Sequence, residues 1–116
     1  MTDEQTTVGQ LRKAVAEFVD QRDWQQFHDP KNLAMSISIE ASELMEHFQW
    51  LRNDQISEVI DCPDSLLQVK EELADVMCFL LAFANTVGID ISEAVRDKLV
   101  KNAEKYPAEK FKGRFK

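Results

Sequence analysis

The sequence predicts an all-α fold built as a four-helix bundle. The 116 residues include only three glycines and three prolines, which leaves little room for the many turns of a β-protein. The chain is rich in alanine, leucine, glutamate, lysine, glutamine and methionine, the residue types that favour helices. Apolar residues recur at helical spacing in four long segments. We expect one domain over residues 1–116, with a core from about 8 to 107 and a basic tail from 108 to 116.

The first helix is expected from residue 8 to about residue 22. Thr7 and Gln10 are spaced as in a capping box, in which each side chain bonds the backbone of the other residue. Residues 23–29 break the helical period. They contain two aromatics and a histidine, namely Trp24, Phe27 and His28. Such side chains are unusual in a merely solvated connection.

The second helix is expected to begin after Asp29, a capping residue that is followed by proline at the first helical position. It should run to about Leu51. A shorter helical segment is expected over residues 55–60, and residues 61–64 should form a turn.

The third helix is expected to be capped by Asp64 or Ser65 and to end near Gly88, a residue suited to a left-handed cap. Residues 73–87 are apolar nearly all round the helix. Either they form the buried centre of the bundle or they face a partner subunit, because so small a domain has little interior to surround a helix. We therefore expect at least a homodimer.

The fourth helix is expected to follow Asp90, which with Glu93 has the spacing of a second capping box, and to stop before Pro107. Residues 110–116, within the basic tail that follows, contain two phenylalanines, Phe111 and Phe115. Either this tail is disordered or it docks on a neighbouring chain.

Two pairs of acidic residues are the strongest functional signal. They are Glu40 with Glu43 and Glu72 with Asp75. Residues three apart share one face of a helix, and both pairs have apolar neighbours that a helix would normally bury. Carboxylates on an apolar face are costly to desolvate, and bound cations would stabilise them. The alternative is that these acids lie on solvated helix faces, as charged residues usually do.

The chemistry of these acids narrows the choice of metal. Four carboxylates without histidine or thiolate suit Mg²⁺ or Mn²⁺, which take phosphate oxygens as further ligands. A di-iron site in a helix bundle would have Glu-x-x-His pairs, and the chain has none. If such cations bind a phosphate substrate that is hydrolysed, the attacking water would need a base, and Glu43 or Glu46 is the candidate.

Composition limits the partners and the compartment. The net charge of −7 disfavours nucleic acid, because binding to its backbone needs clustered Lys and Arg. It does not disfavour a nucleotide delivered with magnesium. Cys62 and Cys78 lack metal-ligand spacing and predict reduced thiols in a cytoplasmic protein. We expect no signal peptide, because the N-terminus is polar and acidic. We also expect no membrane span, since the longest apolar run, residues 76–84, is too short.

Four motifs together resemble the MazG-type nucleotide pyrophosphohydrolases, and most closely their short deoxycytidine-triphosphatase branch. They are Arg22-Asp23-Trp24-x-x-Phe27-His28, then Glu40-x-x-Glu43 running into Phe48-Gln49-Trp50, then Glu71-Glu72-x-x-Asp75, and Lys98-x-x-x-Asn102-x-x-Lys105-Tyr106-Pro107. The resemblance covers roughly residues 8–107. It implies magnesium-dependent cleavage of a nucleoside triphosphate to the monophosphate and pyrophosphate, and a homotetramer made of two dimers.

The resemblance also implies roles for particular residues. The magnesium ligands would be Glu40, Glu43, Glu72 and Asp75. The nucleoside pocket would be lined by Trp24, His28, Trp50 and Phe79. The phosphate and nucleotide side would be formed near the C-terminus by Lys98, Asn102, Lys105 and Tyr106. From the residues alone, Trp50 fits a plain core position as well, and the two lysines fit solvated helix positions.

The chain departs from the family pattern at three positions. Ile39 replaces the first Glu of the Glu-Glu-x-x-Glu motif of the wider family, as is usual in the shorter branch. Val15 and Phe79 stand where cytosine-preferring relatives often carry a polar His and Tyr. The resemblance thus implies dCTP and related pyrimidine nucleotides as substrates, and these departures lead us to expect loose base selectivity. The alternative function is a non-catalytic helical interaction module whose acids bind structural divalent cations.

Overall fold

The computed structural model describes residues 1–114, which contain helices and no strands. The expected all-α class is confirmed. In chain order the elements are α1 (Val8–Gln21), η1 (Trp24–Phe27), α2 (Pro30–Glu46), η2 (Asn53–Gln55), α3 (Ser57–Ile60), α4 (Pro63–Val87), α5 (Ile91–Lys105) and α6 (Ala108–Phe111). Two residues of the expected basic tail, Phe115 and Lys116, lie outside the described residues.

Three of the expected helix boundaries are confirmed by their caps. The hydroxyl of Thr7 accepts the amide of Gln10 at 3.1 Å, and the side chain of Gln10 accepts the amide of Thr7 at 2.8 Å. Asp29 caps α2 by accepting the amide of Asn32 at 2.8 Å. Gly88 ends α4 with a φ of 76°, a left-handed conformation that costs glycine little.

Two other boundaries were predicted wrongly. Helix α2 ends at Glu46 and not near Leu51, because the amides of His47 and Phe48 bond to carbonyls three residues back and tighten the chain into turns. Helix α4 begins at Pro63, with Cys62 in the capping position in place of Asp64 or Ser65. Proline fits the first helical position because its missing N–H would have no partner there.

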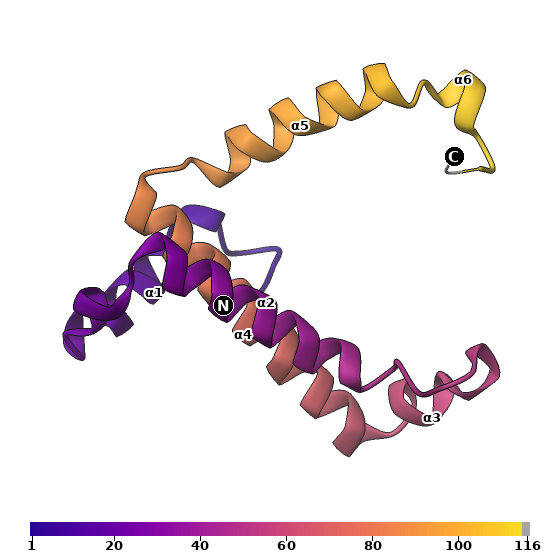
Figure 1. Cartoon of the computed structure of the whole chain (residues 1–116), viewed down its shortest axis with the longest axis horizontal. Coiled ribbons are helices and arrows are strands. Elements are labelled where there is room, and N and C mark those ends of the chain that lie inside the picture. Colours follow the sequence, from indigo (N-terminus) through magenta and orange to yellow (C-terminus); the bar gives the residue numbers. More distant parts are fainter. Residues whose placement is uncertain (115–116) are drawn as a thin grey trace.

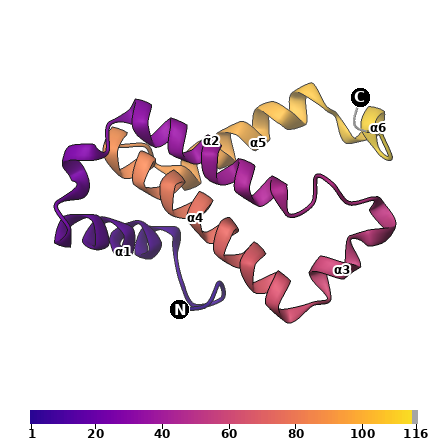
Figure 2. The ribbon, with the colours of Figure 1, turned by 60° about the horizontal axis from the view of Figure 1, so that its bottom comes forward.

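The centre of the molecule is a three-helix layer. Helices α2 and α4 run antiparallel along most of their length, and α1 packs against the second half of α4 (Figures 1 and 2). The buried side chains come from these three helices: Val19, Leu33, Leu81, Ala82 and Ala84. This packing places the C-terminal half of α2 beside the N-terminal half of α4, which are the segments that carry the acidic pairs.

Helix α5 does not complete a bundle with the other three helices. It meets α4 at an angle of 101° and extends away as an arm that ends in α6 (Figure 1). The side chains of Val95, Leu99 and Val100 on this arm are more than half exposed. The expected four-helix bundle is therefore not confirmed within one chain, because the fourth helix packs along none of the others in the described structure.

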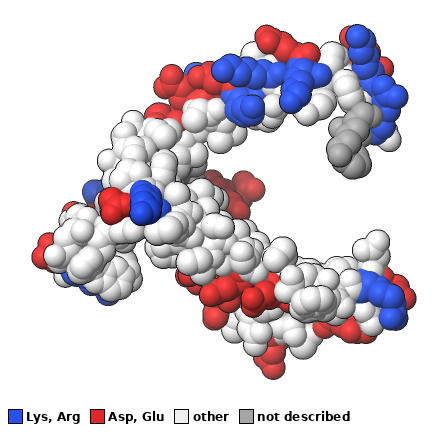
Figure 3. All heavy atoms as spheres, viewed as in Figure 1, with Lys and Arg blue, Asp and Glu red and all other residues white. Residues whose placement is uncertain are grey.

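The arm also concentrates basic charge. Of the thirteen lysine and arginine residues within residues 1–114, seven lie on it or just beyond it: Arg96, Lys98, Lys101, Lys105, Lys110, Lys112 and Arg114. In the space-filling view, basic side chains gather along the arm with acidic ones among them, and further acidic side chains lie on the opposite side of an open gap (Figure 3). The charge of the chain is therefore strongly asymmetric.

The chain has more surface than a compact protein of its size. It exposes 9255 Å², whereas a compact monomer of 13.4 kDa exposes about 6500 Å². Its radius of gyration is 17.3 Å, against about 13 Å for a compact domain of this length. Much of the excess is apolar, including Leu73, Met77 and Leu80 on the helix that was expected either to form the buried centre of the bundle or to face a partner subunit.

No single helix among residues 1–114 is long and apolar enough to cross a membrane. Only α4 and α5 taken together have the length and composition, and these two helices are sharply bent against each other.

Candidate active site

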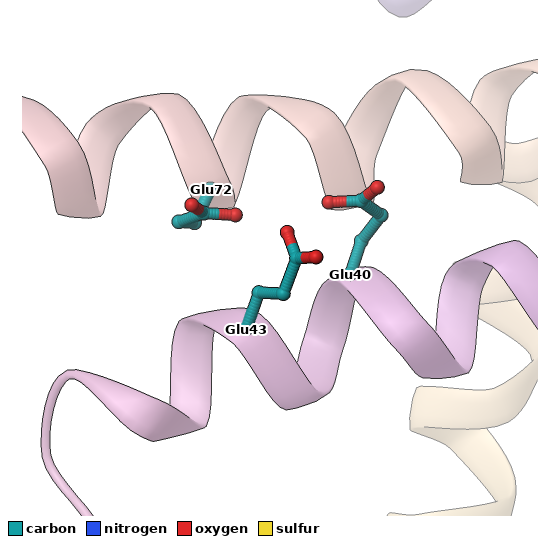
Figure 4. Close-up of side chains that lie close together, drawn as sticks. All are labelled: Glu40, Glu43 and Glu72. Atoms are coloured by element: carbon teal, nitrogen blue, oxygen red, sulfur yellow. The ribbon is translucent and has the colours of Figure 1, made fainter.

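Three of the four predicted acidic ligands converge between α2 and α4. Glu40 and Glu43 lie one turn apart on α2 and point toward Glu72 on α4 (Figure 4). One carboxylate oxygen from each residue lies within 4.8 Å of the other two. The antiparallel packing of the two helices produces this cluster, because each acidic pair has the three-residue spacing that keeps it on one helix face.

The cluster holds its charges in an unfavourable environment. Burial raises the pKa of Glu40, and the neighbouring carboxyl of Glu43 and then the charges of Asp75 and Glu72 raise it further. Burial also raises the pKa of Glu72, again followed by the effects of Glu43 and Asp75. Removal from water and the proximity of like charges both disfavour the ionised carboxylate.

The same cluster fits a divalent cation. Oε2 of Glu40 and Oε2 of Glu72 are buried and have no hydrogen-bond partner. The only ion pair among residues 1–114 joins Arg52 to Asp54, at the protein surface, so no described lysine or arginine neutralises the cluster. Buried carboxylate oxygens without partners are costly, and a hard cation such as Mg²⁺ would bind them.

The raised pKa values predict how metal-free stability depends on pH. In the unfolded chain Glu40 and Glu72 return to their ordinary pKa of 4.5. The folded state therefore binds more protons than the unfolded state above that pH, and the contribution of these groups to stability is lost as the pH rises through the raised values.

Thermal unfolding from about pH 4 to pH 8 without divalent cations measures this effect. The unfolding midpoint of wild type should fall relative to that of Glu72→Gln as the pH rises. Added Mg²⁺ should restore the wild-type midpoint and leave the variant nearly unchanged. A difference between the two proteins that is constant with pH would contradict the assignment.

Two further acids and one histidine lie at different places around the cluster. Asp75 is outside the group of three converging oxygens, although its charge acts on both Glu40 and Glu72. Glu46, the last residue of α2, is exposed and also outside the group. His47 was not predicted as a site residue, yet it is near enough to lower the pKa of Glu72. Its position four residues after Glu43, on the same helix face, was the available signal.

An apolar groove adjoins the acids between α1, η1 and α4. It has a volume of about 590 Å³ and is lined by Trp24, His28 and Phe79, three of the predicted pocket residues. Val15 lines it as well, so its wall is aliphatic at that point. Asp75 belongs to the lining too and therefore connects the groove with the acidic cluster. Grooves of this size with few polar groups are typical of small-molecule sites.

The local structure presents Trp24 to the groove. Asp23, two residues after the end of α1, adopts a left-handed conformation with a φ of 52°, which aspartate tolerates better than most residues. The turn brings the Trp24 ring edge-on to Phe18, with 5.7 Å between ring centroids. The guanidinium of Arg22 covers Phe18 at 3.7 Å. Trp24 itself remains 43% exposed and is available to a flat ligand.

The other predicted substrate residues are not brought to this groove within one chain. Trp50 follows α2 and is 84% exposed. The alternative interpretation of Trp50 as a core residue therefore does not hold within one chain. Lys98, Asn102 and Lys105 share one face of α5, since they are spaced by four and three residues. Tyr106 caps the same helix and contacts Phe111, with ring centroids 5.2 Å apart. All four lie on the arm (Figure 1).

Known proteins match both the sequence and this arrangement of helices. The model of the MazG-like family matches residues 35–116. A crystal structure of a pyrophosphatase from Archaeoglobus fulgidus DSM 4304 is 42% identical and aligns with a TM-score of 0.81, over 92% of this chain and 98% of that one.

Curated relatives share the aligned region as well. dCTP pyrophosphatase 1 of Mus musculus is 36% identical over 107 residues, which are 92% of this chain and 63% of that protein. dCTP pyrophosphatase 1 of Homo sapiens is 37% identical over 102 residues, or 88% of this chain and 60% of that protein. The chain thus spans about three fifths of the length of the curated relatives that it matches.

Proposed function

We propose that this chain, which belongs to the MazG-like family, is a nucleoside triphosphate pyrophosphohydrolase that acts on dCTP and related pyrimidine nucleotides. The observation that carries the proposal is the position of Asp75. This residue lines the aromatic groove and also acts on the charge of Glu40 and Glu72. A nucleotide with its base in the groove would therefore extend its phosphates toward the acids.

The acids would hold Mg²⁺, with Mn²⁺ as an alternative, through Glu40, Glu43, Glu72 and Asp75. When bound, the cation would supply the positive charge that neutralises the phosphate oxygens. Water attacks the triphosphate, the phosphoanhydride bond to the leaving pyrophosphate breaks, and the monophosphate remains. Glu43 is the better candidate to accept the proton of this water, because it lies inside the cluster and Glu46 lies outside.

Base selectivity would be set by the walls of the groove. Trp24 and Phe79 offer flat faces, which stack on any base and discriminate little. Strong discrimination needs polar groups at the base edge. Besides the indole N–H of Trp24, the polar side chains of the lining are His28, Asp75 and Cys78. We therefore expect turnover of dCTP, including C5-modified forms, with loose selectivity against other deoxynucleotides.

The site would be completed by a second copy of the chain. The lysines expected to bind phosphate lie on an arm that makes no bundle with its own chain, and the acids need a positive partner that the described residues of their own chain do not supply. A homodimer would bring the basic arm of one copy to the acidic end of the other and cover the exposed apolar faces of both. A tetramer of two dimers follows from the family resemblance.

The free thiols Cys62 and Cys78 suit the reducing cytoplasm.

A nucleotide panel with product analysis tests the proposed function. Wild-type protein with Mg²⁺ should convert dCTP to equal amounts of dCMP and pyrophosphate. Release of inorganic phosphate as the first product would assign a different reaction, and no product from any nucleotide would favour the non-catalytic module. A preference for dCTP above about a thousandfold would reveal an edge-reading residue that the groove lining does not explain. A preference for purines would exclude the pyrimidine assignment.

A further inference from the structure

Arg12 joins the first helix to the base of the arm. Its Nε donates to Oδ1 of Asn85 at 3.0 Å, and its Nη1 donates to the carbonyl of Ile89 at 2.6 Å. Asn85 returns a bond from Nδ2 to the backbone carbonyl of Arg12, also at 3.0 Å. Both side chains are partly buried. A guanidinium suits this position, because its planar fork can bond two acceptors at once.

These three bonds are unusual in the molecule. Every other hydrogen bond that a side chain makes among residues 1–114 joins residues no more than five positions apart, whereas these span 73 and 77 positions. Ile89 lies in the turn between α4 and α5, directly after the left-handed Gly88. The Arg12 bonds are therefore the polar contacts that hold this turn against the body of the protein.

The turn decides where the arm points. Because α5 packs along none of the helices of its own chain, its direction depends on the cap at Gly88 and on the contacts of Ile89. A small rotation at this turn is amplified along α5, so that Lys98 and Lys105 would move by several ångströms, since each residue adds about 1.5 Å of helix.

The same contacts adjoin the groove. Asn85 lines a second hollow of about 330 Å³ together with Val15 and His28, and these last two residues also line the aromatic groove. Arg12 therefore lies at the junction of the base-binding walls and the arm, outside the acidic cluster.

We propose that Arg12 is a positioning residue, which fixes the α4–α5 turn so that the arm presents its lysines to the triphosphate of a substrate held by a second copy of the chain. The inference rests on the proposed function. This role of Arg12 divides substrate binding into two parts that can be measured separately. The base and the first phosphate depend on the groove and the acids, whereas the outer phosphates depend on the arm and hence on Arg12.

Four variants test this separation. Arg12→Ala removes both donors, Arg12→Lys keeps the charge without the fork, and Asn85→Ala removes one partner. Lys13→Ala is the matched control, because Lys13 is the next residue on α1, carries the same charge and is exposed. For each protein we would measure kcat/KM for dCTP with Mg²⁺, the dissociation constant of dCMP and the thermal midpoint.

Arg12→Ala should lower kcat/KM for dCTP about tenfold, because a displaced arm would lose about one charge-assisted hydrogen bond to the outer phosphates. Binding of dCMP should stay within about twofold of wild type. Asn85→Ala should lower kcat/KM for dCTP to a similar extent. The double variant Arg12→Ala/Asn85→Ala should have a kcat/KM little lower than that of either single variant. Arg12→Lys should fall between wild type and Arg12→Ala, and it provides the comparison if Arg12→Ala does not fold.

Equal losses for dCTP and dCMP, or kcat/KM equal to that of Lys13→Ala, would overturn the role of Arg12. These results are distinct from a failure of the proposed function, in which wild-type protein itself would release no pyrophosphate.

Discussion

Glu40→Gln and Glu72→Gln should each reduce dCTP turnover by about a thousandfold or more. Each substitution keeps the size and shape of the side chain but replaces one of the three clustered carboxylates with a neutral amide. The phosphates would then lack the cation that neutralises them. Initial rates of pyrophosphate release at saturating Mg²⁺ measure this effect.

The same variants should unfold at higher temperature than wild type when no divalent cation is present. The reason is that each removes a charge whose ionisation the fold disfavours, as the raised pKa values of Glu40 and Glu72 show. Glu71→Gln is the matched control, since Glu71 is exposed and adjacent to Glu72. Glu71→Gln should change neither the turnover of dCTP nor the unfolding temperature without divalent cations. Near-wild-type turnover in Glu40→Gln or Glu72→Gln would rule out the carboxylate site.

Mixing two inactive variants should restore activity if the arm acts on the site of another copy. Glu72→Gln lacks one carboxylate of the acidic site. The double variant Lys98→Ala/Lys105→Ala lacks the two arm lysines that are expected to bind phosphate, at an expected cost of about a hundredfold in turnover. In a mixed two-fold dimer, one of the two sites combines intact acids with an intact arm. Random exchange of subunits should therefore recover about a quarter of wild-type activity.

The control for this experiment is Arg96→Ala, a basic residue on the arm that lies two positions before Lys98 and so on a different helix face. It should be active by itself. If mixing after subunit exchange restores nothing, the arm serves its own chain or takes no part in binding. Light scattering at micromolar concentration gives the supporting observation, which is a homodimer or homotetramer and not a monomer.

The local structure was largely predictable from the sequence. Thr7, Asp29 and Gly88 determine helix ends through their own side chains or backbone, so their positions follow from neighbouring residues alone. The three-residue spacing keeps each acidic pair on one helix face. Antiparallel packing of the two helices was then enough to bring Glu40, Glu43 and Glu72 together. The end of α2 and the start of α4 were missed because competing caps and turns lie within a few residues of each other there.

The arrangement of the fourth helix was not predictable in this way. The apolar residues of α5, such as Val95 and Leu99, show only that one face needs cover. They do not say whether that cover comes from the same chain or from another. The bond from Arg12 to the Ile89 carbonyl spans 77 positions, and no local pattern marks such a contact. The direction of the arm is thus a tertiary property.

Binding of Mn²⁺ to substrate-free protein is the most direct test of the acidic site on which the account depends. Electron paramagnetic resonance distinguishes free from bound Mn²⁺ in wild type, Glu72→Gln and Glu71→Gln. We expect wild type and Glu71→Gln to bind Mn²⁺ equally, with Mg²⁺ competing, and Glu72→Gln to bind at least about tenfold more weakly. If wild type leaves all Mn²⁺ free, or if wild type and Glu72→Gln bind Mn²⁺ equally, the proposed cation site of the acidic cluster is contradicted.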